Sequence, residues 1–219
     1  MDKVMSVEKA IEPIKDGMTI MIGGFGGIGS PHTLIDAICK KGVKDLTIIC
    51  NDPGTSNFGN GRFIHEKRVK KLIAAFTSSN REFQEQYKNN EIEVKLIPMG
   101  TLVEAIRAGG FGLGGVLTKT GLGTLVEEGK QKVVVKGVIY LLQEPLKADV
   151  SLIYANRADR MGDLVYHGTA RSHTPSMATT ADYVICEADN IVEIGDIPPN
   201  YVHTQSVFVN AIVQKEKRQ

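Results

Sequence analysis

Tryptophan is absent from this 219-residue chain, and aromatic residues make up only 6% of it. So few rings leave little for the stacking platforms that bind single-stranded nucleic acid. The formal net charge is +1, from 26 basic and 25 acidic residues, so no strong field attracts a nucleic acid or an anionic membrane. We therefore expect neither as a partner.

Cysteines and long apolar runs are also scarce. The three cysteines, Cys39, Cys50 and Cys186, have no metal-ligand spacing, so we expect buried apolar side chains and no metal site. An odd cysteine count and an N-terminal segment without a secretory apolar core favour a reducing compartment. No run approaches the ~20 apolar residues that span a bilayer. These features predict a cytoplasmic protein.

Glycine, in contrast, is abundant, with 23 residues that gather in clusters. The first cluster, Gly-Gly-Phe-Gly-Gly-Ile-Gly at residues 23–29, follows an apolar run of strand length at residues 18–22. Ser30-Pro31 then opens a helix pattern by the usual N-cap and N1 preferences. Such a cluster indicates backbone that turns tightly or approaches a ligand closely.

Apolar periodicity predicts alternating strands and helices along the chain. We expect strands at residues 18–22, 46–50, 70–76, 94–98, 150–155 and 183–187, and helices at residues 6–15, 82–88 and 102–108, after Ser30-Pro31, and as a turn at 176–181. A hairpin is predicted over residues 133–142 with its turn at Lys136-Gly137. This order implies one α/β domain over residues 1–219, with a mostly parallel sheet and helices on both faces.

Residues 24–29 fit G-x-G-x-x-G, which makes an NAD(P)-binding Rossmann oxidoreductase an alternative. Asp52 stands at the end of the next strand, about where a ribose-binding acid belongs. Pro31 fits poorly into the first turn that would follow the third glycine, and Pro53-Gly54 continues a loop. A non-catalytic small-molecule-binding module remains a second alternative on fold alone.

A longer pattern carries a more specific resemblance. Asp16-Gly17-x-x, three apolar residues and Gly23-Gly24-Phe25-x-x-x-Gly29-x-Pro31 resemble the signature of the A (alpha) subunit of family I coenzyme A transferases. That family includes succinyl-CoA:3-oxoacid and acetate/butyrate–acetoacetate transferases. Further similar segments follow in order: Asn51-Asp52, Pro98-x-Gly100-Thr101-Leu102, Ile106-Arg107-Ala108-Gly109-Gly110, Thr118-x-Thr120-Gly121-x-Gly123-Thr124, Glu127-x-Gly129 and Ala158-Asp159-x-x-Gly162.

The resemblance implies a CoA-transferase or NagB-like fold and ping-pong transfer of CoA from an acyl-CoA, short-chain or 3-oxoacyl, to a free carboxylic acid. The nucleophilic glutamate of the family lies in a Ser-Glu-Asn-Gly motif of the B part, and no glutamate of this chain has that context. We therefore expect no catalytic residue in this chain, a separate B subunit in an A2B2 heterotetramer, and no cofactor, coenzyme A being the substrate.

The resemblance and the glycine clusters together define a candidate cleft. Backbone N–H groups of residues 23–29 and 109–115 are expected to approach the substrate, and the amide of Asn51 to donate into the cleft. The residues expected to line the cleft are Gly23, Gly24, Phe25, Gly26, Gly29, Asn51, Met99, Gly100, Gly109 and Gly110.

Two positions depart from the family pattern. Met99 stands where the family has an oxyanion-stabilising glutamine, and Ser172-His173-Thr174 where it has Asn-Phe-Asn. A thioether cannot donate a hydrogen bond, so Met99 predicts a changed acyl preference. His173 is a candidate substrate contact, with an ordinary packing role as the alternative.

Overall fold

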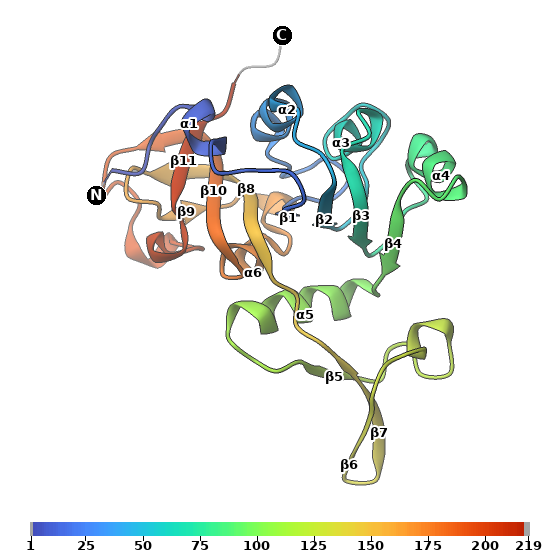
Figure 1. Ribbon diagram of the computed structural model, residues 1–219. Coiled ribbons are helices and arrows are strands. Elements are labelled where there is room, and N and C mark those ends of the chain that lie inside the picture. Colours follow the sequence, from blue (N-terminus) through green and yellow to red (C-terminus); the bar gives the residue numbers. More distant parts are fainter. Residues whose placement is uncertain (1, 217–219) are drawn as a thin grey trace.

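The computed structural model describes residues 2–216. Its main sheet has the strand order β11-β10-β8-β1-β2-β3-β4, in which all neighbours are parallel, and the short β9 pairs antiparallel with β8 (Figure 1). The strands are β1 Thr19–Ile22, β2 Leu46–Cys50, β3 Val69–Ala74, β4 Glu93–Leu96, β8 Ala148–Asp159, β9 Leu164–Val165, β10 Ala181–Val192 and β11 Ala211–Gln214.

Helices cover both faces of this sheet because its strands are apolar on both sides. One face packs against α1 Val7–Ile11, α2 His32–Lys41, α3 Gly61–His65 and α4 Arg81–Lys88, and the other against α5 Met99–Gly110 and α6 Thr174–Ala178. In β1, Ile20 and Ile22 enter the first core while Met21 enters the second. Four 3₁₀ turns complete the helical elements: η1 Leu125–Glu127, η2 Gly168–Arg171, η3 Pro199–Tyr201 and η4 Ser206–Phe208.

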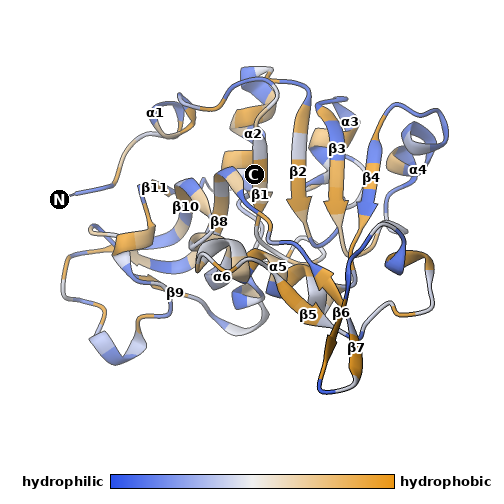
Figure 2. Cartoon of the chain, turned by 60° about the horizontal axis from the view of Figure 1, so that its bottom comes forward, coloured by the Kyte–Doolittle hydropathy of each residue, from blue (hydrophilic) through white to orange (hydrophobic). Residues whose placement is uncertain are grey.

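A second, three-stranded antiparallel sheet projects from the body below α5 (Figures 1 and 2). It consists of β5 Val116–Thr118, β6 Lys132–Val135 and β7 Val138–Gln143 in the order β5-β7-β6. The β6–β7 hairpin turns at Lys136 and Gly137, whose φ angles of 49° and 77° are the paired positive values of a two-residue hairpin turn. The predicted hairpin is confirmed.

The predicted α/β class, with a mostly parallel sheet and helices on both faces, is confirmed, but several element boundaries were wrong. The first helix ends at Ile11, close before Pro13, and not at residue 15, although Ser6 caps it as expected by accepting from the Lys9 N–H at 3.3 Å. β8 and β10 each run for 12 residues, because hydrogen-bond pairing continues past the apolar runs that predicted them. The elements α3, β5, β9 and β11 were not predicted.

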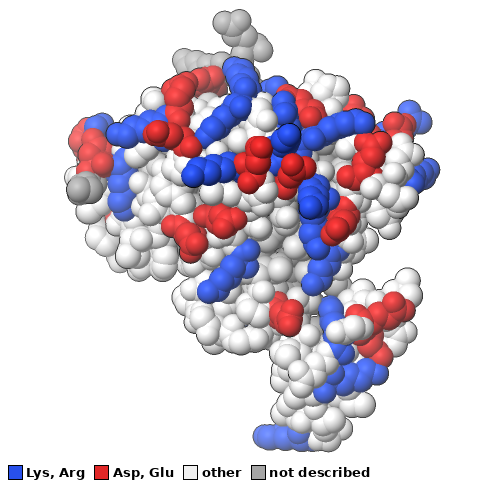
Figure 3. Space-filling view, viewed as in Figure 1, with Lys and Arg blue, Asp and Glu red and all other residues white. Residues whose placement is uncertain are grey.

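Charged side chains of both signs are mixed on the face of the molecule seen in Figure 3. On the face seen in Figure 3, basic and acidic side chains alternate over the main sheet and its helices. No helix within residues 2–216 is long and apolar enough to cross a membrane.

Candidate active site

The glycine cluster lies at the point where the sheet reverses its direction of growth. After β1 the chain adds β2, β3 and β4 on one side, and later β8, β10 and β11 on the other. Open α/β sheets bind ligands outside the carboxyl ends of their strands at such a switch point. The loop of residues 23–31, which we call the glycine loop, follows β1 directly and is therefore the candidate active-site loop.

The glycine loop is a small hairpin whose tip is closed by reciprocal backbone hydrogen bonds between Phe25 and Ile28, both 3.0 Å. Gly24 and Gly29 have positive φ angles and no room for a side chain. A Cβ on Gly24 would touch Ser30, and one on Gly29 would lie 2.8 Å from the Ala170 carbonyl oxygen. These two glycines therefore serve close packing of the loop against its own base and against η2.

Gly26 differs from them, because its φ is +55° and a Cβ there would find nothing within 4 Å. Its side-chain position opens to solvent at the tip of the glycine loop. Among residues 2–216, the N–H groups of Gly27 and Gly29 find no hydrogen-bond acceptor. Backbone N–H groups without an acceptor in the chain are available as donors to a carboxylate or thioester oxygen.

A buried carboxylate links the glycine loop to the loop after β2. Asp52 is 4% exposed. It accepts hydrogen bonds from the Gly26 N–H at 3.0 Å, the Asn51 amide nitrogen at 2.7 Å and the Gly54 N–H at 2.9 Å. Because these donors occupy Asp52 within the chain, it is not placed to hold the ribose of a dinucleotide.

Asn51 is buried beside Asp52 and directs its amide nitrogen to that carboxylate. Its amide oxygen has no partner among the described residues. The Asn51 carbonyl oxygen accepts from the N–H groups of Ala75 and Phe76 at 3.0 and 3.3 Å, which ties the loops after β2 and β3 together. Donation from Asn51 to a substrate stays a prediction.

The rim of the site is apolar and open. Phe25 and Ile28 at the loop tip are 51% and 57% exposed, and Phe58 and Phe76 from the neighbouring loops are 44% and 41% exposed. The ring of His32 packs on Phe58 with 4.8 Å between centroids, and its Nε2 lies 3.2 Å from the Gly27 carbonyl oxygen. The first turn of α2 therefore braces the glycine loop.

Residues 170–174 form the opposite wall of the site. A Cβ on Gly23 would lie 3.1 Å from the Thr174 hydroxyl oxygen, so the two segments touch. His173 is 6% exposed, its Nδ1 lies 2.9 Å from the Ser172 hydroxyl, and its Nε2 has no partner among the described residues. Burial lowers the pKa of His173, although the negative charge of Asp52 partly opposes this. The structure thus places a neutral, buried imidazole beside the loop.

Met99 and Gly100 open α5, whose first turn follows Pro98 and has no side-chain cap. Met99 is half-buried and Gly100 exposed. A groove of about 470 Å³ runs from Gly100 and Thr101 past Arg107 to β5. Arg107 is paired with Glu104 at 2.7 Å on the helix surface. The helix predicted to start at residue 102 starts at Met99, three residues earlier.

Gly109 and Gly110 are not in a loop, contrary to the sequence prediction of a glycine-rich segment at residues 109–115. They form the last turn of α5, roughly 16 Å from Met99 at 1.5 Å per residue. A Cβ on Gly109 would collide with the Leu146 carbonyl oxygen and one on Gly110 with the Thr179 side chain. Close packing of α5 explains both glycines, and a substrate contact at either stays untested.

Sequence reasoning missed Glu187, a fully buried carboxylate in β10. A charge inside the apolar run 183–188 was the signal that could have revealed it. Burial raises its pKa to about 7, although the Leu34 and Thr33 N–H groups oppose the shift.

The prediction for the start of α2 was also wrong. The helix begins at His32 with Pro31 at its N-cap, and Ser30 does not cap it.

The three cysteines are free thiols in the protein interior. Cys39, Cys50 and Cys186 are free and buried, as predicted. Burial raises the pKa of the Cys39 thiol to about 12. Within residues 2–216, no group of three or more His, Cys, Asp or Glu side chains is arranged to hold a metal ion.

Comparison with known proteins gives the class that this fold and loop define. The chain belongs to the coenzyme A transferase family, whose profile matches residues 4–215. It is 48% identical over 213 residues to the acetoacetyl-CoA:acetate/butyrate CoA transferase alpha subunit of Clostridium acetobutylicum, covering 97% of this chain and 98% of that one. It is 43% identical over 215 residues to the acetate CoA-transferase subunit alpha of Escherichia coli K12, with 98% of both chains covered.

Solved structures agree on the fold. An acyl-CoA transferase of E. coli O157:H7 matches with a TM-score of 0.87 and 20% identity, over 98% of this chain and 47% of that chain. Glutaconate coenzyme A-transferase of Acidaminococcus fermentans matches with a TM-score of 0.86 and 19% identity, over 97% and 75% of the two chains. The family resemblance read from the sequence is confirmed, and the dinucleotide-binding and non-catalytic alternatives are set aside.

Proposed function

We propose that this chain is the A half of a two-chain CoA-transferase that exchanges CoA between a short-chain or 3-oxoacyl-CoA and a free carboxylic acid. The observation that carries the proposal is the glycine loop at the switch point, whose backbone at Gly26 is open and whose apolar tip is half exposed. A thioester has this character, with a polar carbonyl between apolar arms. The relatives named above are alpha subunits for acetoacetyl-CoA, acetate and butyrate.

The chemistry needs a carboxylate nucleophile, which we assign to a B subunit. A glutamate carboxylate of that subunit attacks the acyl-CoA carbonyl, forming a mixed anhydride and releasing CoA as the thiolate. The thiolate then attacks the glutamyl carbonyl, which gives a glutamyl-CoA thioester and frees the first acid. A second carboxylate reverses the two steps and leaves with CoA. Covalent catalysis thus divides one acyl transfer into easier steps, with no cofactor.

The role of this chain is to bind and to stabilise negative charge. The N–H groups of Gly27 and Gly29 and the first-turn N–H groups of α5 at Gly100 and Thr101 are the donors proposed for the developing oxyanion. Met99 then lines the acyl pocket with a flexible apolar side chain. Gly23, Gly24, Phe25 and Asn51 complete the proposed cleft.

Two observations support a separate B subunit. The chain spans only 47% of the E. coli O157:H7 acyl-CoA transferase, so a second half of similar length is needed to complete that protein. The two relatives described above are alpha subunits. We infer an A2B2 heterotetramer in the cytoplasm, in keeping with three free thiols.

The test combines reconstitution with chemical trapping. The purified chain alone is expected to transfer no CoA, and adding the B subunit is expected to start transfer. Borohydride added after acyl-CoA should reduce the enzyme thioester, and mass spectrometry should find the reduced glutamate on the B subunit. Turnover by this chain alone, or a reduced glutamate on one of its peptides, would contradict the proposal.

A further inference from the structure

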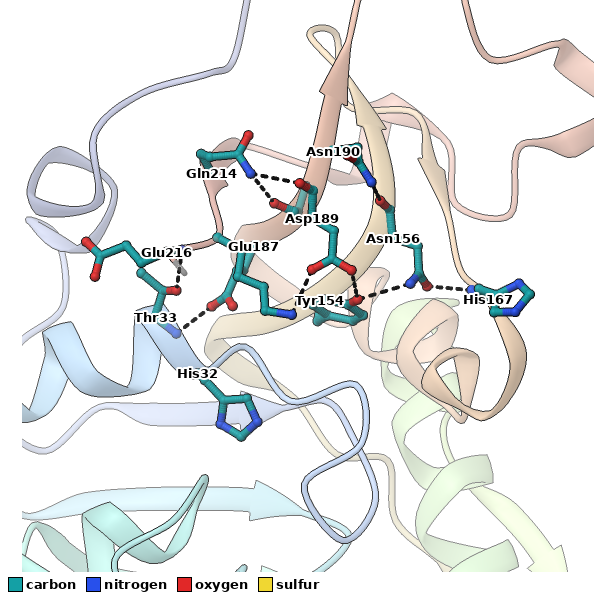
Figure 4. Close-up of polar contacts among 12 residues, drawn as sticks. His32, Thr33, Tyr154, Asn156, His167, Glu187, Asp189, Asn190, Gln214 and Glu216 are labelled. Carbon is teal, nitrogen blue, oxygen red and sulfur yellow. Dashed lines mark hydrogen bonds and ion pairs between the residues drawn. The ribbon is translucent and has the colours of Figure 1, made fainter. Parts of the chain in front are cut away.

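Glu187 makes an unusual connection between the sheet and the glycine loop. Its side chain, on β10, is 0% exposed. One carboxylate oxygen, Oε2, accepts from the backbone N–H of Thr33 at 2.7 Å and of Leu34 at 3.2 Å (Figure 4). The other oxygen, Oε1, has no partner among the described residues. A carboxylate from β10, the second strand from one edge of the main sheet, thus points at the first turn of α2.

This helix needs an acceptor from elsewhere. The first N–H groups of a helix have no partner inside it, and a Ser, Thr, Asp or Asn side chain at the N-cap usually accepts from them. Here the N-cap is Pro31, which makes no side-chain hydrogen bond. Glu187 replaces the missing cap, and its negative charge also meets the positive end of the helix dipole.

The capped turn is the one that holds the glycine loop. His32, next to Thr33, points its ring away from Glu187 toward the loop (Figure 4), where Nε2 lies 3.2 Å from the Gly27 carbonyl oxygen. The same ring packs on Phe58, against which Gly27 also lies. An unbroken series of contacts therefore leads from Glu187 through the first turn of α2 and His32 to Gly27.

The positive charge of Lys215 partly lowers the pKa of Glu187, but its ammonium group is hydrogen-bonded elsewhere. Lys215, on the segment after β11, is paired with Asp189 of β10 at 2.7 Å and lies 5.0 Å from the ring centroid of Tyr154 on β8. Tyr154 in turn donates to Asp189. The N–H of Glu216, which follows Lys215, donates to the Thr33 hydroxyl at 3.1 Å. With the nearest cation engaged, the backbone N–H groups of α2 are the direct partners of Glu187.

We propose that Glu187 is a positioning residue of the active-site loop: its ionised carboxylate holds the first turn of α2 in the place from which His32 fixes the Gly27 carbonyl. The inference rests on the proposed function, because the loop serves the transferase reaction. It follows that protonation of Glu187, which weakens the acceptor, loosens the loop and lowers turnover. The raised pKa of Glu187, about 7, puts this loss in the neutral range.

The first test is the pH profile of kcat/KM for the reconstituted two-chain enzyme. We expect wild-type activity to fall below about pH 7 and Glu187→Gln to lose this acidic limb. At pH 8, Glu187→Gln should be roughly tenfold slower, the scale of one hydrogen bond to a charged group. Ile38→Val is the matched control, because it removes a buried methyl group from the same helix and leaves the cap intact. It should keep the wild-type profile.

The second test is coupling. If Glu187 acts through His32, the double variant Glu187→Gln/His32→Ala should be no slower than His32→Ala within about twofold. Fully multiplicative losses, or an unchanged profile in Glu187→Gln, would overturn the inference.

A readout without turnover separates this inference from the proposed function. Amide hydrogen exchange of residues 23–31 should be faster in Glu187→Gln than in wild type and Ile38→Val at the same pH. Unchanged exchange would overturn the positioning role. An inactive wild-type pair would contradict the proposed function and leave the exchange result valid.

Discussion

Replacing Gly26 by alanine tests whether substrate approaches the backbone of the glycine loop. The position suits the test because the structure leaves open space for the new methyl group, with nothing within 4 Å. Gly24 is less suitable, because a Cβ there would strike Ser30 and disturb the loop itself. A loss of activity in Gly26→Ala that exceeds the loss in a control with the same backbone strain would therefore come from a clash with the bound substrate.

The expected cost to folding follows from the backbone angle. Gly26 has a φ of +55°, in the left-handed region where an alanine costs roughly 1–2 kcal/mol. Gly42 after α2 is the matched control, since it is left-handed with a φ of +83° and its Cβ would also meet nothing within 4 Å. Both variants should lose about the same free energy of unfolding.

Their activities should differ. A methyl group at Gly26 would stand where the acyl-CoA or carboxylate approaches, and a displacement of ~1 Å at a reacting centre costs roughly 10²-fold. We expect kcat/KM of the two-chain enzyme to fall by about that factor in Gly26→Ala and by less than about twofold in Gly42→Ala.

The assay is acyl-CoA turnover with urea unfolding of each variant measured in parallel. Equal kcat/KM in Gly26→Ala and Gly42→Ala, at equal stability, would refute the reasoning. The glycine at position 26 would then serve only its turn.

Two further predictions concern selectivity and pH. Met99→Gln should shift preference toward acetyl-CoA over longer acyl-CoA donors; ratios of kcat/KM that stay within about twofold, or ~0.4 kcal/mol, would show that Met99 does not affect selectivity. Glu187 has a folded-state pKa raised from 4.5 to about 7, so the native state holds its proton more tightly and loses stability as pH rises through that window, by up to about 3 kcal/mol. The difference in unfolding free energy between wild type and Glu187→Gln should therefore change between pH 4.5 and 7. His173, whose pKa is lowered, contributes the opposite pH dependence to both proteins, so its contribution cancels in the difference. A difference that stays constant over this pH range would contradict the assigned shift.

The sequence predicts the alternation of strands and helices well where a strand is buried on both faces and therefore apolar throughout. The run Leu46–Cys50, for example, coincides with β2. Prediction fails where polar residues continue a strand. β10 runs on through Asp189 and Asn190, because its pairing with β8 continues to Val192. Periodicity within one segment cannot report a ladder whose partner lies elsewhere in the chain.

The candidate site shows the same division. The glycine loop was predictable because a cluster of glycines between a strand and a helix is local information. Gly109 and Gly110 also stand in a glycine cluster, yet they lack a side chain because Leu146 and Thr179 pack against them. Glu187 lies 154 positions from Thr33 and 153 from Leu34 in the sequence, and no local pattern predicts a contact over such a separation.

The switch point at β1 also has a consequence for how the protein is synthesised. The four strands β1 to β4 are made first and pair with one another in chain order, whereas β8 must find β1 from far along the chain; the hydrogen bond from Thr19 to Asp149 joins residues 130 positions apart. Loop closure over such a distance makes this seam slow to form relative to local pairs. The glycine loop leaves the ribosome with the early half, and its wall at residues 170–174 with the late half. The two walls of the candidate site therefore come together only when the late strands pair with the early ones.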